Sequence, residues 1–196
     1  MRTAEIKRTT AETSIELKLN LDGTGTGRIE TGVGVMDHML TLFARHARMD
    51  LSVCCKGDTQ VDDHHSVEDI GICLGAAIAQ AVGDKRGIKR YGSMLLPMDE
   101  ALVLCALDLS GRSCLRYQAQ IPSQKIGTFD TELVEEFFLG LTRSAGLTLH
   151  LRQMDGTNSH HIVEAMFKAF GRALREAVSI DESLGGEIPS TKGVLV

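Results

Sequence analysis

Aromatic residues and proline are scarce in this chain of 196 residues, which contains no Trp, 2 Tyr, 6 Phe and 3 Pro. With so few aromatic side chains, we expect a core built from Leu, Ile, Val, Ala and Met. Hydrophobic residues make up 43% of the chain, an ordinary share for a globular protein. This length suits one compact domain or two small fused ones, and either can bury a core.

Three other absences exclude classes of protein. Basic residues do not predominate, and the formal net charge of -5 argues against a nucleic-acid-binding protein. No apolar run approaches the roughly 20 residues that a helix needs to span a bilayer. The N-terminal segment MRTAEIKRTTAETS lacks the apolar stretch of a secretory signal.

The 5 cysteines form no C-x-x-C pair. Cys54, Cys73 and Cys105 lie in apolar runs, where a thiol serves as a small hydrophobic side chain. We therefore expect buried free thiols and a reducing, cytoplasmic compartment.

Two segments of the chain repeat each other, DDHHSVEDIGICLGAAIAQAV and NSHHIVEAMFKAFGRALREAV. With an offset of 96 residues, eight of the nineteen positions from His64 to Val82 are identical, without a gap. The identical pairs are His64/His160, His65/His161, Val67/Val163, Glu68/Glu164, Gly75/Gly171, Ala77/Ala173, Ala81/Ala177 and Val82/Val178. The chain is therefore predicted to contain an internal duplication.

Hydrophobic periodicity predicts the elements of the first half. Alternation indicates short strands at about 4–9 and 14–21, and we interpret the glycine-rich DGTGTGR segment as a hairpin loop. A helix is predicted in GVMDHMLTLFARHARM, where Val35, Met39, Leu42 and Phe43 have helical spacing, followed by a strand in DLSVCC. A long helix from His64 to about residue 83 places apolar residues on one stripe, namely Ile70, Leu74, Ile78 and Ala81.

The second half repeats this order. We predict strands near 91–97 and in EALVLCALDLSGRSCLRYQAQI, a helix over 129–144 capped by Thr128 or Asp130, a strand in GLTLHLRQ and a last helix from Ser159 to about 179. Met166, Phe170 and Leu174 match Ile70, Leu74 and Ile78. Each half, residues 1–90 and 91–196, is thus a strand-strand-helix-strand-helix (ββαβα) unit preceded by a short strand. We predict an α+β fold with helices on one face of each sheet, and one compact unit because no flexible linker separates the halves.

The repeated H-H-x-V-E motif has the composition of a metal site. Residues i and i+4 share a helix face, so His64 and Glu68 can approach one metal ion, whereas His65 lies about 100° further round and points elsewhere. The same holds for His160 and Glu164 against His161. With His38 and His150 the chain offers eight ligands, enough for two metal ions with four protein ligands each.

Imidazole and carboxylate without thiolate favour Mn²⁺ or Fe²⁺, with Zn²⁺ possible. A single histidine at a helix start is more often a capping or core residue. The occurrence of two copies of the motif favours the metal interpretation.

Several other residues have two open interpretations. Asp62 and Asp63 either complement the helix dipole or take part in the site. Arg90 and Arg112 are either solvated or functional, and Lys168 is an ion-pair partner of Glu164 or a substrate contact. The tail segment IPSTKGVLV carries three hydrogen-bond donors suited to an anionic group, namely Ser190, Thr191 and Lys192.

The chain resembles the imidazoleglycerol-phosphate dehydratase family over residues 3 to 195. The resemblance lies in MDHMLTLFARH, DDHHSVEDIGICLG, PMDEALV, LDLSGR, FDTELVEEFF, LTLH, NSHHIVEAMFKAFGRAL and PSTKG, in this order. It implies a monofunctional lyase of histidine biosynthesis, which converts imidazoleglycerol phosphate to imidazoleacetol phosphate and water. It also implies a helical bundle between two β-sheets, two Mn²⁺ ions per active site, and an assembly of 24 subunits with active sites where subunits meet.

The resemblance also assigns roles to residues. It implies that all eight ligands named above bind metal: His38, His64, His65, Glu68, His150, His160, His161 and Glu164. Substrate contacts carry over onto Glu12, Arg90, Arg112, Ser190 and Lys192. We add Lys168 and Thr191 as candidate substrate contacts, and expect catalytic roles for Glu12, His65 and His161. We expect Glu12 to be the general acid or base.

Two other functions are compatible with a pair of metal sites. A dinuclear metallohydrolase would use the ions to activate water. A metal-binding assembly protein would use the same ligands to hold subunits together. Neither requires the arginines or the PSTKG segment.

Overall fold

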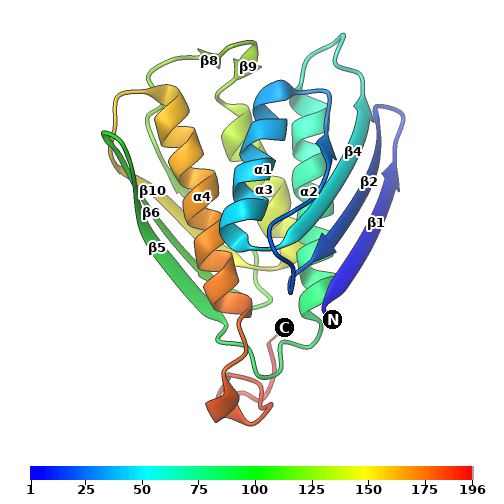
Figure 1. Ribbon diagram of the computed structural model, residues 1–196, viewed down its shortest axis with the longest axis vertical. Coiled ribbons are helices and arrows are strands. Elements are labelled where there is room, and N and C mark those ends of the chain that lie inside the picture. The colour runs from blue at the N-terminus through cyan, green and yellow to red at the C-terminus, as the bar shows by residue number, and fades with distance from the viewer. Residues whose placement is uncertain (196) are drawn as a thin grey trace.

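The computed structural model describes residues 1–195 and has an α+β architecture. Four helices lie between two four-stranded sheets, which form the outer layers (Figure 1). This arrangement confirms the predicted fold class. Across residues 1–195, none of the helices has the length and apolar character needed to cross a membrane.

The first-half sheet has the strand order β1-β2-β4-β3. Its strands are β1 (Thr3–Thr9), β2 (Thr13–Asn20), β3 (Ile29–Glu30) and β4 (Asp50–Gly57). In β2 every second residue is buried, as the alternating sequence TSIELKLN predicts. The hairpin predicted at DGTGTGR is wrong, because β4 lies between β2 and β3, and β3 pairs with β4 in parallel.

The second-half sheet repeats this topology with the order β5-β6-β10-β7. Its strands are β5 (Tyr91–Met98), β6 (Ala101–Asp108), β7 (Cys114–Gln118) and β10 (Thr148–Asp155), and a small separate hairpin joins β8 (Lys125–Ile126) to β9 (Phe129–Asp130). As in the first half, the third strand, β7, lies parallel to the inserted strand, β10. The duplication in the sequence is therefore also a duplication of sheet topology.

The four helices are α1 (Gly34–Ala47), α2 (His64–Val82), α3 (Leu133–Ala145) and α4 (Ser159–Val178), and a 3₁₀ turn η1 (Glu182–Leu184) follows. All four run in the same direction, so their first residues gather at one end of the bundle (Figure 1). The helix predicted over 129–144 begins later, because residues 129–130 form β9. Its expected caps are also wrong: Glu132 occupies the N-cap position and makes no side-chain cap bond.

The two halves pack together through two pairs of crossing helices, α2 with α3 and α1 with α4, and glycines at the crossings allow a close approach. A Cβ on Gly75 would lie 2.3 Å from the Leu141 carbonyl oxygen, and one on its repeat partner Gly171 would lie 2.8 Å from that of Phe43. Both distances are too short for any side chain. Each half thus packs its last helix against the other half, which is why the chain forms one unit.

Two predictions about the core need correction. All six Phe are buried, and five of them pack as a chain of aromatic contacts between α1, α3 and α4: Phe43, Phe137, Phe138, Phe167 and Phe170. The core is therefore aromatic at the helix crossings as well as aliphatic. In β4 the alternation buries Cys55 and exposes Cys54, the reverse of what its apolar neighbours suggested, while Cys73 and Cys105 are buried free thiols as predicted.

Candidate metal and phosphate sites

The start of α4 is capped so that its histidine pair is held in place. The Asn158 side chain accepts hydrogen bonds from the backbone N–H groups of His160 and His161, at 2.9 and 3.2 Å. This is the usual role of Asn at an N-cap, and it leaves both imidazoles free to project from the helix start. At the start of α2, the Asp62 side chain plays the same capping role and accepts a hydrogen bond from the His64 backbone N–H at 2.8 Å. This contact favours the structural interpretation of Asp62.

Three predicted ligands from the two halves meet at this end of the bundle. The Nε2 atoms of His38 and His160 lie 3.2 and 3.1 Å from Glu164 Oε2. Ligand atoms of these three residues all lie within 4.8 Å of one another, the one such group of three His, Cys, Asp or Glu side chains found in residues 1–195. Two imidazole nitrogens and one carboxylate oxygen form a donor set that suits Mn²⁺ or Fe²⁺.

Glu164 is poised to remain ionised although it is buried. Burial raises its pKa, but hydrogen bonds from Lys168 and His38 outweigh this effect and hold the pKa at about 2. Lys168 Nζ lies 2.5 Å from Glu164 Oε1, so the predicted i, i+4 ion pair is present. The other carboxylate oxygen, Oε2, faces the two histidines.

The first-half motif is less complete within one chain. His64 Nε2 and Glu68 Oε2 are 3.8 Å apart on the predicted shared face, and their side chains are 41% and 38% exposed. Glu164, by contrast, is 9% exposed. The first-half pair is therefore open to ligands from outside the chain.

The second histidine of each motif points away from the first, as predicted, and a carboxylate holds its Nδ1 atom. His65 Nδ1 is 3.0 Å from Asp58 Oδ2, and His161 Nδ1 is 2.7 Å from Glu100 Oε2. These hydrogen bonds are the main cause of a raised pKa in both histidines. A carboxylate on Nδ1 fixes the orientation of each ring and leaves Nε2 as the other nitrogen, the arrangement typical of histidines that bind metal.

Sequence reasoning missed Asp58 and Glu100. Glu100 also accepts the backbone N–H groups of Thr157 and Asn158, at 3.2 and 2.7 Å, so it ties the β5–β6 turn to the start of α4. A signal was present for Glu100, because it belongs to the PMDEALV segment. Asp58 follows β4 in no recognisable motif.

Glu12 lies beside the first histidine pair. Its Oε1 atom is 3.6 Å from His65 Nε2, and its side chain is 52% exposed. Asp99 takes the corresponding place in the second half, with Oδ2 3.7 Å from His161 Nε2. The two acids occupy equivalent turns, between β1 and β2 and between β5 and β6. The duplication therefore extends to the acid beside the second histidine of each motif.

His150 is separated from the other predicted ligands. In β10 the neighbouring Leu149 and Leu151 face the helices, so His150 lies on the outer, exposed face of the sheet. The sequence grouped it with seven ligands near the helix starts, and the structure does not bring it to them within one chain.

The predicted phosphate contacts do come together. Arg90, Arg112, Ser190, Thr191 and Lys192 all line one cavity of about 600 Å³ beside the C-terminal segment. Arg90 pairs with Asp108 through Nε at 2.7 Å and Nη2 at 3.0 Å, and its Nη1 donates to the Pro189 carbonyl at 2.9 Å. These bonds use three of the five N–H donors of a guanidinium, and they fix the Pro-Ser-Thr-Lys segment next to it.

The cavity and the cluster of predicted metal ligands lie at opposite ends of α4. The Arg90 backbone N–H donates to the Ala177 carbonyl, whereas His160 stands seventeen residues earlier in the same helix. At 1.5 Å per residue the two sites are about 25 Å apart along the helix axis. A small molecule cannot span that distance within one chain.

Comparison with known proteins gives a consistent result. The family model described as imidazoleglycerol-phosphate dehydratase matches residues 31–174. A protein of that name from Jannaschia sp. is 61% identical over 195 residues, which cover 100% of both chains. Another from Lachnoclostridium phytofermentans is 61% identical over 194 residues, covering 99% of this chain and 98% of the relative.

Solved structures agree with these relatives. The Staphylococcus aureus enzyme of the same name superposes with a TM-score of 0.84 at 42% identity, covering 91% of this chain and 99% of that one. The Pyrococcus furiosus enzyme, solved in complex with (S)-C348, gives 0.84 at 38% identity, with 97% and 100% coverage.

Proposed function

Because the chain belongs to the imidazoleglycerol-phosphate dehydratase family, and is thus a hydro-lyase, we propose that it eliminates water from imidazoleglycerol phosphate with the help of two divalent metal ions. The product would be imidazoleacetol phosphate, an intermediate of histidine biosynthesis. The observation that carries the proposal is the gathering of His38, His160 and Glu164 at one end of α4, together with the cavity lined by Arg90, Arg112 and Lys192 at the other.

The metal ligands proposed from the sequence fall into two sets. His38, His160 and Glu164 form an inner set within one chain, and His64 with Glu68 forms the core of a second set. His65 and His161 are held through Nδ1, which leaves Nε2 available, and His150 lies on the outer face of β10, so we propose that these three complete the sites of neighbouring copies. Bound Mn²⁺ or Fe²⁺ would supply Lewis-acid polarisation of the two imidazole nitrogens of the substrate.

The separation of about 25 Å between metal ligands and phosphate cavity supports active sites shared between subunits. One copy would hold the imidazole ring through its histidine end, and another would hold the phosphate through Arg90, Arg112, Ser190, Thr191 and Lys192. Such a division requires contact between copies, and a closed complex of 24 subunits is the form that we propose. The 5 free cysteines are those of a reducing compartment, which supports a cytoplasmic location.

Glu12 is the residue that we propose for proton transfer. The reaction removes a weakly acidic proton from C2 of the substrate and expels the C3 hydroxyl, a poor leaving group unless it is protonated. Glu12 is exposed, lies 3.6 Å from His65 and is not part of the inner ligand set, so its carboxylate is free to accept or deliver a proton. Clamping of the phosphate by Arg112 and Lys192 would fix the reacting carbons relative to Glu12. We also propose that Lys168 supports substrate binding indirectly, because its ion pair keeps the Glu164 carboxylate ionised.

The direct experiment measures turnover of imidazoleglycerol phosphate by metal-stripped protein before and after addition of Mn²⁺. Turnover that appears only with the metal is expected. Release of inorganic phosphate without dehydration would point to a metallohydrolase, and no turnover by folded, metal-loaded protein would refute the proposal.

A variant separates the role of Glu12 from metal binding. Glu12→Gln should lower turnover by about 10²–10⁴-fold, the usual contribution of a general acid or base, while the metal content per chain stays unchanged. Unchanged turnover would remove Glu12 from the mechanism.

A further inference from the structure

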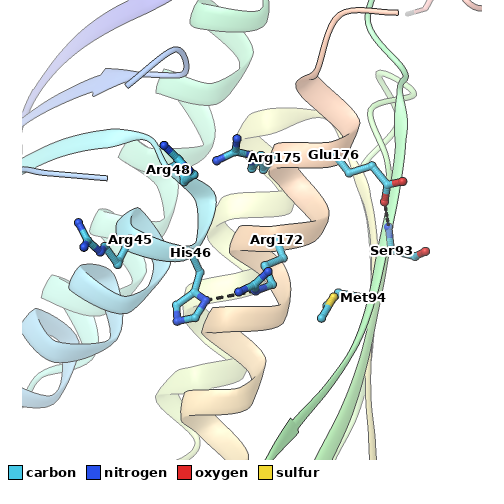
Figure 2. A pocket seen from close by; sticks show the side chains of 8 residues that line it. All are labelled: Arg45, His46, Arg48, Ser93, Met94, Arg172, Arg175 and Glu176. Carbon is cyan, nitrogen blue, oxygen red and sulfur yellow. Dashed lines mark hydrogen bonds between the residues drawn. The ribbon is translucent and has the colours of Figure 1, made fainter. Parts of the chain in front are cut away.

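A second cleft opens between the end of α1, the outer face of α4 and strand β5, and Figure 2 shows its side chains. Its volume is about 580 Å³, within the range of small-molecule sites. It is lined by Arg45, His46, Arg48, Ser93, Met94, Arg172, Arg175 and Glu176. None of these residues belongs to the metal ligands or to the phosphate cavity described above.

Four arginines give this cleft its charge. Arg45 and Arg48 are three residues apart at the end of α1, and Arg172 and Arg175 are three residues apart on α4. Arg172 and Arg175 are neighbours on the surface of α4 at this spacing. Arg48 is the C-cap of α1 and adopts a left-handed backbone conformation, and its guanidinium lies towards Arg175, whereas Arg45 points away from α4 (Figure 2). In a chain with a net charge of -5, this is a local concentration of positive charge.

These arginines are not neutralised by the part of the chain that the structure describes. No carboxylate of residues 1–195 lies within 4.0 Å of any of their guanidinium nitrogens. The one acid in the lining, Glu176, instead accepts the Ser93 backbone N–H at 3.0 Å. The guanidinium groups of Arg48, Arg172 and Arg175 face the cleft and repel each other, and an anion bound between them would relieve that repulsion (Figure 2).

His46 adds a donor rather than an acceptor to the cleft. Burial and the neighbouring Arg172 lower its pKa, which favours the neutral ring. Its Nδ1 accepts a hydrogen bond from Arg172 Nε at 3.3 Å, and the proton of this neutral ring therefore sits on Nε2. The bond also orients the Arg172 fork, whose terminal nitrogens stay available.

The repeat offers an internal comparison. With the offset of 96 residues, Arg172, Arg175 and Glu176 correspond to Ala76, Ala79 and Gln80 on α2. The same helix face in the first half is therefore uncharged. The packing of the last helix of each half does not require arginines there.

We propose that this cleft binds a small polyphosphate anion, with one phosphate group held by Arg172 and Arg175 on α4 and the next by Arg48 at the end of α1. Three guanidinium groups from two elements suit at least two linked anionic groups better than a single one, and arginine matches phosphate oxygens bidentately. The lining contains no Phe, Tyr or Trp on which a base could stack, which favours a bare phosphate chain over a nucleotide.

Inorganic pyrophosphate is the probe, titrated calorimetrically into the assembled, metal-loaded protein. The test variant, Arg172→Ala with Arg175→Ala, installs the residues of the first half. The matched control, Arg116→Ala with Arg143→Ala, removes two exposed arginines elsewhere. Metal content is measured after each titration, because pyrophosphate also chelates Mn²⁺, and Arg112→Ala distinguishes binding in the phosphate cavity.

Saturable binding to the unmodified protein is expected, weakened at least tenfold in the test variant and unchanged in the control and in Arg112→Ala. Turnover of imidazoleglycerol phosphate should be the same in the test variant. Equal weakening in both double variants, or no saturable binding, would overturn the proposal. A changed sedimentation coefficient of the test variant without pyrophosphate binding to the parent would also overturn it, since the cleft would then be a contact between copies.

Discussion

The two H-H-x-V-E motifs begin equivalent helices but differ in what surrounds them. In the second half, Glu164 is 9% exposed and contacts His38, His160 and Lys168. In the first half, Glu68 is 38% exposed and faces His64 at 3.8 Å. The same five-residue motif therefore yields a preformed cluster in one half and an open pair in the other.

Residues outside the motif cause this difference. The residue four positions after the glutamate is Lys168 in the second half and Ile72 in the first, so an ammonium group is present at one site and absent from the other. His38 reaches the second cluster because α1 crosses α4, with Gly171 allowing the close approach to Phe43. A duplicated motif fixes backbone positions, whereas the third ligand depends on which helix lies next to it.

The largest predicted effect distinguishes the two glutamates. Glu164→Gln should destabilise the metal-free protein by about 3–5 kcal/mol, because it leaves the half-buried Lys168 without its partner. Glu68→Gln, at an exposed position, should change stability by less than about 0.5 kcal/mol. Thermal unfolding of both metal-free variants is the measurement, and equal losses would show that the two sites are equivalent.

The next largest predicted effect concerns the carboxylates that contact Nδ1 of His65 and His161, the second histidine of each motif. Glu100→Gln and Asp58→Asn should each weaken Mn²⁺ binding by about 10–100-fold, because the amide no longer fixes the Nδ1 proton of His161 or His65. Calorimetric titration of metal-free protein with Mn²⁺ measures this. Glu132→Gln, an exposed acid at the start of α3, serves as the control and should leave the affinity unchanged.

The smallest predicted effect concerns the loop before β3. A carboxylate accepts hydrogen bonds from this loop in the first half, and the second half has no carboxylate at the equivalent position. Asp50 accepts the backbone N–H groups of Thr24 and Thr26, at 2.9 and 3.1 Å, and these bonds lower its pKa to about 2. A lowered pKa stabilises the fold above pH 3.8, and this contribution is lost as the pH falls towards 2. Thr148 takes the equivalent place at the start of β10.

Asp50→Asn should therefore cost about 1 kcal/mol near neutral pH, a decrease of roughly 2–4 °C in Tm. The difference between variant and parent should shrink as the pH is lowered from 5 to 2. A Tm difference that grows with acidification would contradict this explanation of the loop.

The sequence predicted what depends on local pattern. The helices at His64 and Ser159 and the alternation in β2 follow from spacing, and the structure confirms them. Of the two interpretations of Lys168, the structure shows the ion pair with Glu164. The family resemblance, rather than any local pattern, implied that the PSTKG segment and the two arginines act together, and they line one cavity.

The rest depends on contacts between distant segments. No local pattern shows that β4 inserts between β2 and β3, so DGTGTGR was interpreted as a hairpin. Asp58 is near His65 because the β4–α2 loop folds back towards the start of α2. His150 is far from the helix starts because its side chain lies on the face of the sheet that points away from the helices. The separation of the metal and phosphate sites follows from the length of α4 and was not visible in the spacing of the motifs.

The central claim is that metal ligands and phosphate contacts of one active site come from different copies, and mixing two inactive variants tests it most directly. His160→Ala should be inactive because the metal cluster is broken, and Arg112→Ala because the phosphate is no longer held. When the two chains are dissociated and reassembled together, we predict recovered turnover, because some sites combine an intact cluster with an intact phosphate cavity. Mixed assemblies that form but stay inactive would show that one chain must supply both, and would contradict the claim.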